Sequence, residues 1–97
     1  AQSLTLVMDS DLQISRLVLT QGHYLKPHRV RQRLVIQCLE GQLAFETMGR
    51  VLMLNPGDLC HIAPEEEHAV RALTEASALL TLFGTHTDSS DNFGDIA

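Results

Sequence analysis

Short apolar runs separated by turn residues recur along the chain as far as Phe83, and this pattern limits the folds that are available. The runs are rich in Leu, Val, Ile and Thr, and none is long enough or suitably spaced to form a convincing helix. Regularly spaced short strands with Gly and Pro turns favour a sandwich or a closed barrel. We therefore expect an all-β chain of eight or nine short antiparallel strands, at about 3–8, 12–20, 34–39, 42–46, 50–54, 59–63, 68–73 and 77–83.

Turn residues divide these strands. Asn55-Pro56-Gly57-Asp58 is the strongest turn signal, and Asp9-Ser10-Asp11 and Thr47-Met48-Gly49 mark two others. We interpret 34–39 and 42–46 as the arms of a hairpin joined by Glu40-Gly41. Because Pro27 cannot donate a main-chain hydrogen bond, 22–27 is expected to be a loop or an edge segment, with His28 opening the next segment of the chain.

The chain of 97 residues is the size of one domain. We assign 1–84 to a single β-barrel domain and 85–97, which is polar and acidic, to a flexible tail. A core this small and several edge strands lead us to expect a homodimer.

The net charge of -5 argues against a nucleic-acid partner, which requires clustered Lys and Arg. No apolar run approaches the roughly 18 residues that span a bilayer. We therefore expect a soluble, cytoplasmic protein with no membrane partner. Cys38 and Cys60 each stand within an apolar run, so both are interpreted as small buried thiols.

Two spacings, Gly22-x5-His28 and Gly57-x10-His68, resemble the two motifs of the cupin family, with further agreement at 39–41 and 56–58. The resemblance covers roughly 12–83. It implies an RmlC-like jelly-roll barrel, also called a double-stranded β-helix, in which three histidines and one glutamate hold a divalent metal.

The metal motif is degenerate in this chain. His28 and His68 occupy the first and third histidine positions, but the second histidine position holds Val30 and the glutamate position holds Leu34. A firm Zn, Fe, Mn or Ni site usually takes three or four protein ligands, and Val and Leu offer no lone pair. A metal at His28 and His68 would need an atypical further ligand, for which the candidates are Gln32, Cys38, Cys60, His61 and 65–67.

The resemblance instead favours a mostly apolar pocket with two imidazoles at its mouth. Three arginines, Arg29, Arg31 and Arg33, could steer an anionic ligand toward it, since guanidinium groups bind carboxylate and phosphate. Alternatively, they form a solvated face or pair with the glutamates at 65–67. The expected pocket residues are His28, Val30, Leu34, His68, Val70 and Leu82.

Three functions remain open from the sequence. The first is binding of a small molecule, anionic in one version, around His28 and His68. The alternative is a metal-dependent enzyme of the dioxygenase, isomerase or decarboxylase type. The third is a dimeric structural domain without a ligand. The chain carries no nucleophile elbow, Walker loop, dinucleotide fingerprint or zincin helix, so the sequence identifies no catalytic residue.

Overall fold

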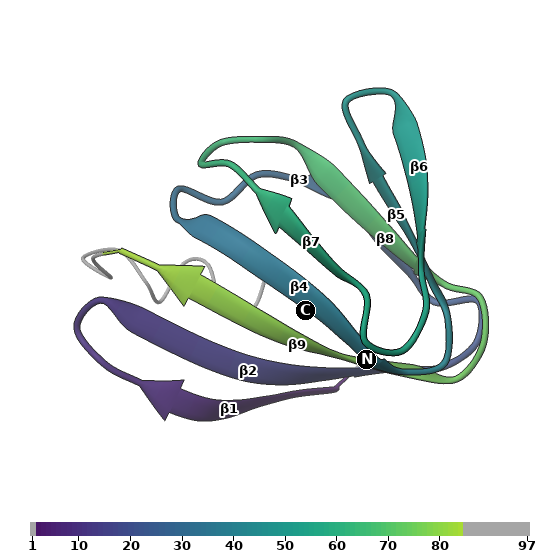
Figure 1. Ribbon diagram of the computed structural model, residues 1–97, viewed down its shortest axis with the longest axis horizontal. Helices are drawn as coiled ribbons and strands as arrows, with labels where there is room; N and C mark the ends of the chain where they lie inside the picture. The colour runs from purple at the N-terminus through teal and green to yellow at the C-terminus, as the bar shows by residue number, and fades with distance from the viewer. Residues whose placement is uncertain (1, 85–97) are drawn as a thin grey trace.

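A computed structural model describes residues 2–84 as two antiparallel sheets packed face to face (Figure 1). The expected flexible tail, 85–97, lies outside the described residues. The strands are β1 (Gln2–Met8), β2 (Leu12–Leu19), β3 (Tyr24–His28), β4 (Arg33–Glu40), β5 (Leu43–Thr47), β6 (Arg50–Leu54), β7 (Leu59–Ile62), β8 (His68–Ala72) and β9 (Ala76–Phe83). The all-β prediction is confirmed.

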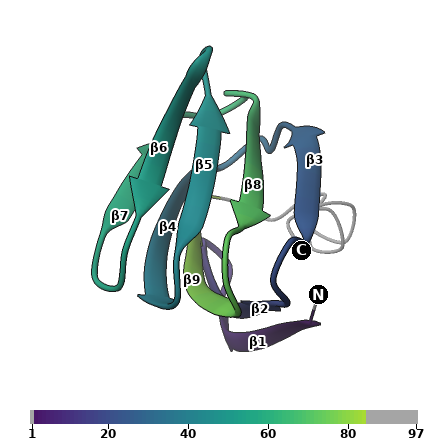
Figure 2. The same cartoon turned by 90° about the vertical axis from the view of Figure 1, so that its right-hand side faces the viewer.

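Strands from both halves of the chain mix within each sheet. The five-stranded sheet has the order β1-β2-β9-β4-β7, and the four-stranded sheet has the order β3-β8-β5-β6. Figure 2 shows the four-stranded sheet with the other sheet behind and below it. In the described part of the chain no helix could cross a membrane.

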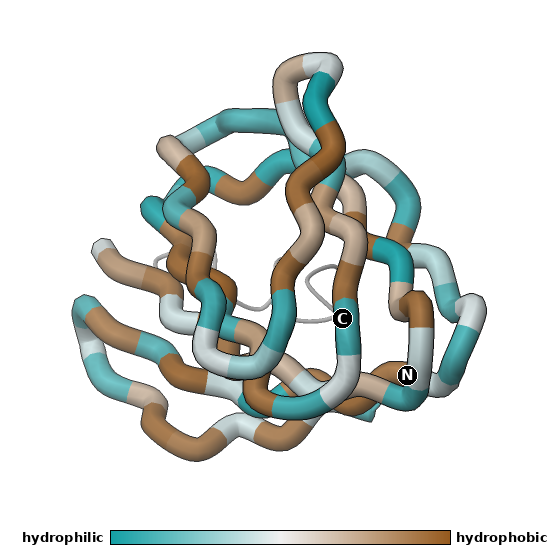
Figure 3. The backbone as a smooth tube through the Cα atoms, turned by 45° about the vertical axis from the view of Figure 1, so that its right-hand side comes forward, coloured by the Kyte–Doolittle hydropathy of each residue, from teal (hydrophilic) through white to brown (hydrophobic). Residues whose placement is uncertain are grey.

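The core fills the space between the two sheets. Alternate residues of the strands point inward, except in β1, whose residues are all exposed, and most of the apolar residues that point inward are buried. Figure 3 follows the alternation of hydrophobic and hydrophilic residues along the strands. Among the largest fully buried side chains are Leu17, Leu19, Leu34, Ile36, Leu43, Phe45, Ile62 and Leu82.

The predicted hairpin across Glu40-Gly41 is wrong. β4 pairs with β7 and β9, whereas β5 pairs with β6 and β8, so the chain changes sheets at Gly41. Gly41 has a φ of 75°, and a Cβ there would lie 2.1 Å from the main-chain oxygen of Glu75. Two short strands and a glycine turn look the same in the sequence whether the strands pair or belong to opposite sheets.

The other expected turns are confirmed. Met48 and Gly49 connect β5 to β6 with φ values of 52° and 73°, the two positive values of a type I′ hairpin. At the turn before β7, Asp58 N donates to Asn55 O at 2.8 Å. Gly57 takes a φ of 94° there.

The segment with Pro27 is an edge strand, as one of the two expectations had it. β3 lies at the edge of the four-stranded sheet, with an irregular register between Leu25 and His28. His28 therefore ends this strand and does not open a new segment. At an edge, the missing donor of Pro27 costs no interstrand hydrogen bond.

Candidate functional site

Two imidazoles meet at one end of the barrel. His28 ends β3, His68 begins β8, and the two residues are paired in the register of these strands. Their ring centroids lie 4.5 Å apart, with the planes tilted by 58°. Antiparallel pairing thus unites residues that are far apart in the sequence.

Both rings are held in the same tautomer. His28 Nδ1 lies 3.0 Å from the carbonyl oxygen of Lys26, and His68 Nδ1 lies 3.0 Å from that of Glu66. Since a carbonyl oxygen only accepts, each Nδ1 carries the proton and donates it. When the rings are neutral, each Nε2 is therefore an acceptor. His28 Nε2 is buried, and it has no hydrogen-bond partner within residues 2–84.

The environment of His68 disfavours its charged form. His68 as a whole residue is only 3% exposed, and its ring stacks on Phe45, with centroids 5.8 Å apart. Burial lowers the pKa of His68, and the nearby His28 lowers it further, whereas the hydrogen bond to the Glu66 carbonyl and the Glu66 carboxylate oppose the shift.

Acidification should therefore destabilise the protein through His68. The unfolded chain binds a proton near the ordinary pKa of 6.5, but the folded chain binds it only at lower pH. The contribution of neutral His68 to the free energy of unfolding should thus be present in full above the ordinary histidine pKa. It should decrease as the pH falls below that pKa, by at most about 1.4 kcal/mol per pH unit for one proton. Urea unfolding at several pH values measures the effect, and His68→Phe should remove it. If the free energy of unfolding of His68→Phe changed with pH as steeply as that of the unmodified protein, groups other than His68 would cause the pH dependence.

The interior next to the histidines is nearly filled. A cavity of about 10 Å³ is bounded by both imidazoles and by apolar side chains from both sheets. That volume is about the minimum for one water molecule. Of the predicted pocket residues, Leu34 and Val70 also line this cavity, whereas Val30 and Leu82 are buried core residues that do not.

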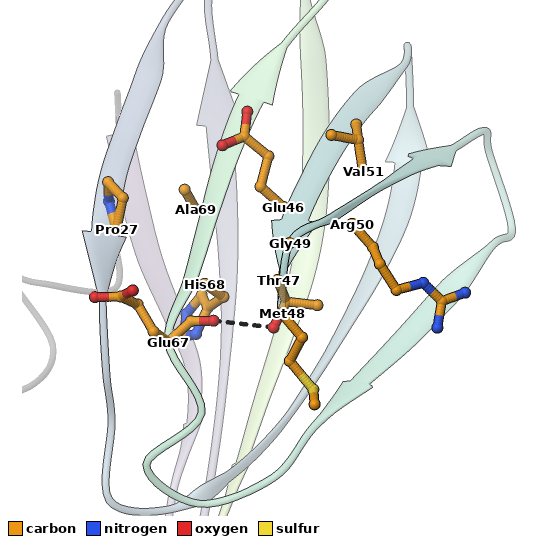
Figure 4. A pocket seen from close by; sticks show the side chains of 10 residues that line it. All are labelled: Pro27, Glu46, Thr47, Met48, Gly49, Arg50, Val51, Glu67, His68 and Ala69. Atoms are coloured by element: carbon orange, nitrogen blue, oxygen red, sulfur yellow. Dashed lines mark hydrogen bonds between the residues drawn. The ribbon is translucent and has the colours of Figure 1, made fainter.

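A larger depression of about 230 Å³ lies at the same end of the barrel (Figure 4). It was not predicted from the sequence, because it is formed where the β5–β6 turn approaches the starts and ends of other strands. His68 belongs to the lining of both the depression and the internal cavity. The depression is lined by Pro27, Glu46, Thr47, Met48, Gly49, Arg50, Val51, Glu67, His68 and Ala69.

Hydrogen bonds tie the loop before β8 to this end of the barrel. Thr47 Oγ1 lies 2.6 Å from the Glu66 carboxylate and 2.9 Å from the carbonyl of Glu67. The carboxylate of Glu66 also accepts from Ala63 N at 3.0 Å. The hydrogen bond from Thr47, followed by that from Ala63, lowers the pKa of Glu66. The loop is therefore held against the histidine pair.

The three arginines of the predicted anion-steering group have exposed side chains. Arg29 Nη1 donates to the carbonyl of Glu65 at 3.2 Å. Arg33 Nη1 lies 2.7 Å from His61 Nε2, which must accept because guanidinium only donates. Arg33 and His61 occupy outward positions of β4 and β7, so Arg33 is directed away from His28.

The residues present do not fit the divalent metal of the cupin motif. Val30 and Leu34 are both buried apolar side chains, and residues 2–84 contain no cluster of three or more His, Cys, Asp or Glu that could hold a metal. Burial, which is the main cause, raises the pKa values of the Cys38 and Cys60 thiols, and this disfavours the thiolates that metals bind.

Gln13 was missed in the sequence analysis. It is 1% exposed, and its Nε2 donates to Ser15 Oγ at 3.3 Å, while its Oε1 has no partner within residues 2–84. It faces inward on β2, beside Leu82, in the same row of the sheet as Leu34. The sequence held one signal that Gln13 is buried: Gln13, Ser15 and Leu17 are successive alternate residues of one strand, so the two polar residues lie on the same face as Leu17.

Solved structures share this fold. An RmlC-like cupin from Shewanella frigidimarina superposes with a TM-score of 0.83 at 20% identity, covering 90% of this chain and 78% of that one. The structure of KdgF from Halomonas gives a TM-score of 0.82 at 22% identity, covering 92% and 82%. A cupin superfamily protein from Desulfitobacterium hafniense gives 0.81 at 17% identity, covering 84% and 75%. No curated protein sequence matches the chain.

These likenesses define the chain as a small cupin-type jelly-roll barrel, which confirms the predicted resemblance. A family model described as the AraC-like ligand binding domain matches residues 16–87. Since this is most of the chain, the protein belongs to that family of ligand-binding domains.

Proposed function

We propose that this protein binds a small molecule at the histidine end of the barrel, and that the ligand donates a hydrogen bond to the imidazole pair. Membership of a ligand-binding family supports the general function. The observation that carries the proposal is the buried Nε2 of His28, an acceptor without a partner within residues 2–84. A buried polar atom without a partner is costly, which favours a bound donor.

The tautomers define which ligand group fits. Both Nδ1 atoms are donors to main-chain carbonyls, so both Nε2 atoms can accept from a hydroxyl or an N–H group. A carboxylate would face two acceptors and be repelled while the imidazoles are neutral. The lowered pKa of His68 keeps its ring neutral near pH 7.

The surroundings define the rest of the ligand. The internal cavity has apolar walls apart from the two imidazoles, and the depression beside His68 provides most of the volume. We infer a compact ligand whose body lies in the depression and whose donor group reaches inward. An anionic substituent would have to lie at the rim, where Arg29 contacts the loop before β8.

Matched pairs of an alcohol and its methyl ether test this proposal. Only the alcohol donates a hydrogen bond, so alcohols should bind at least about tenfold more tightly than their ethers, as expected for a hydrogen bond of about 1.4 kcal/mol. NMR titration measures the affinities, and the ¹⁵N shifts of His28 and His68 should move, while that of His61 stays unchanged. Equal binding of alcohols and ethers would contradict the donor requirement.

A further inference from the structure

Two carboxylates line the depression at the histidine end, and no cation of the described chain is paired with either. Glu46 and Glu67 form no salt bridge within residues 2–84. The carboxylate of Glu46 accepts one long hydrogen bond, from Tyr24 Oη at 3.4 Å. Arg50 is the cation in the lining, and Figure 4 shows its guanidinium group directed away from both carboxylates. The depression therefore carries unpaired negative charge.

A buried imidazole in the same lining indicates that a hydrogen-bond donor meets these carboxylates. His68 is 3% exposed, and its Nδ1 donates to the carbonyl of Glu66. Its Nε2 has no hydrogen bond to any residue that the structure describes. A group that enters the depression therefore meets an imidazole nitrogen and two carboxylates, all of which only accept when the ring is neutral.

From this arrangement we infer that the ligand is an organic amine, bound in its protonated form with the ammonium group in the depression. The inference rests on the proposed function, which requires a donor, and adds that the donor carries a positive charge. A primary ammonium group has three N–H donors, so one can go to an imidazole Nε2 while the others go to carboxylates. A carboxylate or phosphate in the same place would be repelled by Glu46 and Glu67.

The other walls of the depression suit the hydrocarbon part of such an amine. Pro27, Met48, Val51 and Ala69 provide apolar surface, and the small side chain of Ala69 leaves the space above it open. The volume of about 230 Å³ is below the roughly 300 Å³ at which pockets for drug-sized ligands begin. We therefore expect a small amine with a compact apolar body.

Three probes with one carbon skeleton test the inference: cyclohexylamine, cyclohexanol and cyclohexyl methyl ether. NMR titration near neutral pH should show that the amine binds at least about tenfold more tightly than the alcohol, and the alcohol more tightly than the ether. Glu67→Gln and, independently, Glu46→Gln keep the shape of the side chain but remove its charge. Each should weaken the amine at least about fivefold and leave the alcohol unchanged.

The matched control is Glu75→Gln, which removes the same charge from the loop between β8 and β9, at the opposite end of the barrel. The carboxylate of Glu75 accepts from Gln21 N at 2.8 Å, and it does not line the depression. Glu75→Gln should therefore leave the affinity for cyclohexylamine unchanged. Circular dichroism establishes that each variant is folded, and two independent variants at the site keep the test valid if one of them fails to fold.

The three probes separate a failure of this inference from a failure of the proposed function. Equal binding of cyclohexylamine and cyclohexanol, with weaker binding of the ether, would overturn the inference and leave the proposed function intact. Equal binding of all three probes would overturn both. The inference would also fail if neither Glu67→Gln nor Glu46→Gln weakened the amine, or if Glu75→Gln weakened it as much as they do.

Discussion

Replacing Gly41 by alanine is expected to lower the free energy of unfolding by about 3 kcal/mol or more, because two costs combine. The first is the φ of 75°, which side chains rarely adopt. The second is the approach of a Cβ to main-chain and side-chain atoms of 74–76 at 2.1–2.9 Å. The chain crosses between the sheets at this point, so relief would require the turn between β8 and β9 to move away.

Gly49→Ala is the matched control for this substitution. Gly49 has nearly the same φ, 73°, but a Cβ there would meet nothing within 4 Å. It should therefore show only the conformational cost of about 1 kcal/mol. Urea unfolding of both variants measures the difference. Equal losses would mean that the close approach at Gly41 contributes nothing.

His28→Phe is expected to separate stability from binding. Phenylalanine keeps the shape of the ring but removes the buried Nε2, which has no partner within residues 2–84. The substitution also loses the hydrogen bond from Nδ1 to the carbonyl oxygen of Lys26, which is an exposed residue. Because removing the unpaired acceptor should stabilise the protein by more than this loss destabilises it, the free energy of unfolding should rise by about 1 kcal/mol. The same change should weaken binding of an alcohol at least about tenfold if the proposed function holds.

Chemical unfolding and NMR titration measure the two effects of His28→Phe. His61→Phe is the control, since His61 lies on the outside of β7 and bonds to Arg33. It should leave the affinity for alcohols unchanged. If His28→Phe were instead clearly destabilising, the buried nitrogen would have a partner in the protein and would not be available to a ligand.

Much of the fold could be predicted from the sequence because its signals are local. Alternating apolar residues and strong turns, such as Asn55-Pro56-Gly57-Asp58, located eight of the nine strands to within two residues at either end. The ninth, β3, was expected only as a loop or an edge segment. Strand pairing was harder, since local sequence does not specify which strand is a neighbour, and the hairpin at Gly41 was wrong for that reason.

The candidate site could be predicted only in part. The resemblance to the cupin motifs implied that His28 and His68 meet, and Val30 and Leu34 indicated an incomplete metal motif. The depression beside His68 and the buried amide of Gln13 could not be predicted, because they depend on how separate elements approach each other in space.

The sequence by itself determined an all-β chain, its turns and the two histidines, because each rests on residue type and short spacing. Only the tertiary structure decided the tautomers of His28 and His68, the near-filling of the barrel interior and the faces left uncovered. The physical reason is that hydrogen-bond direction and burial depend on atoms that the chain brings together only on folding.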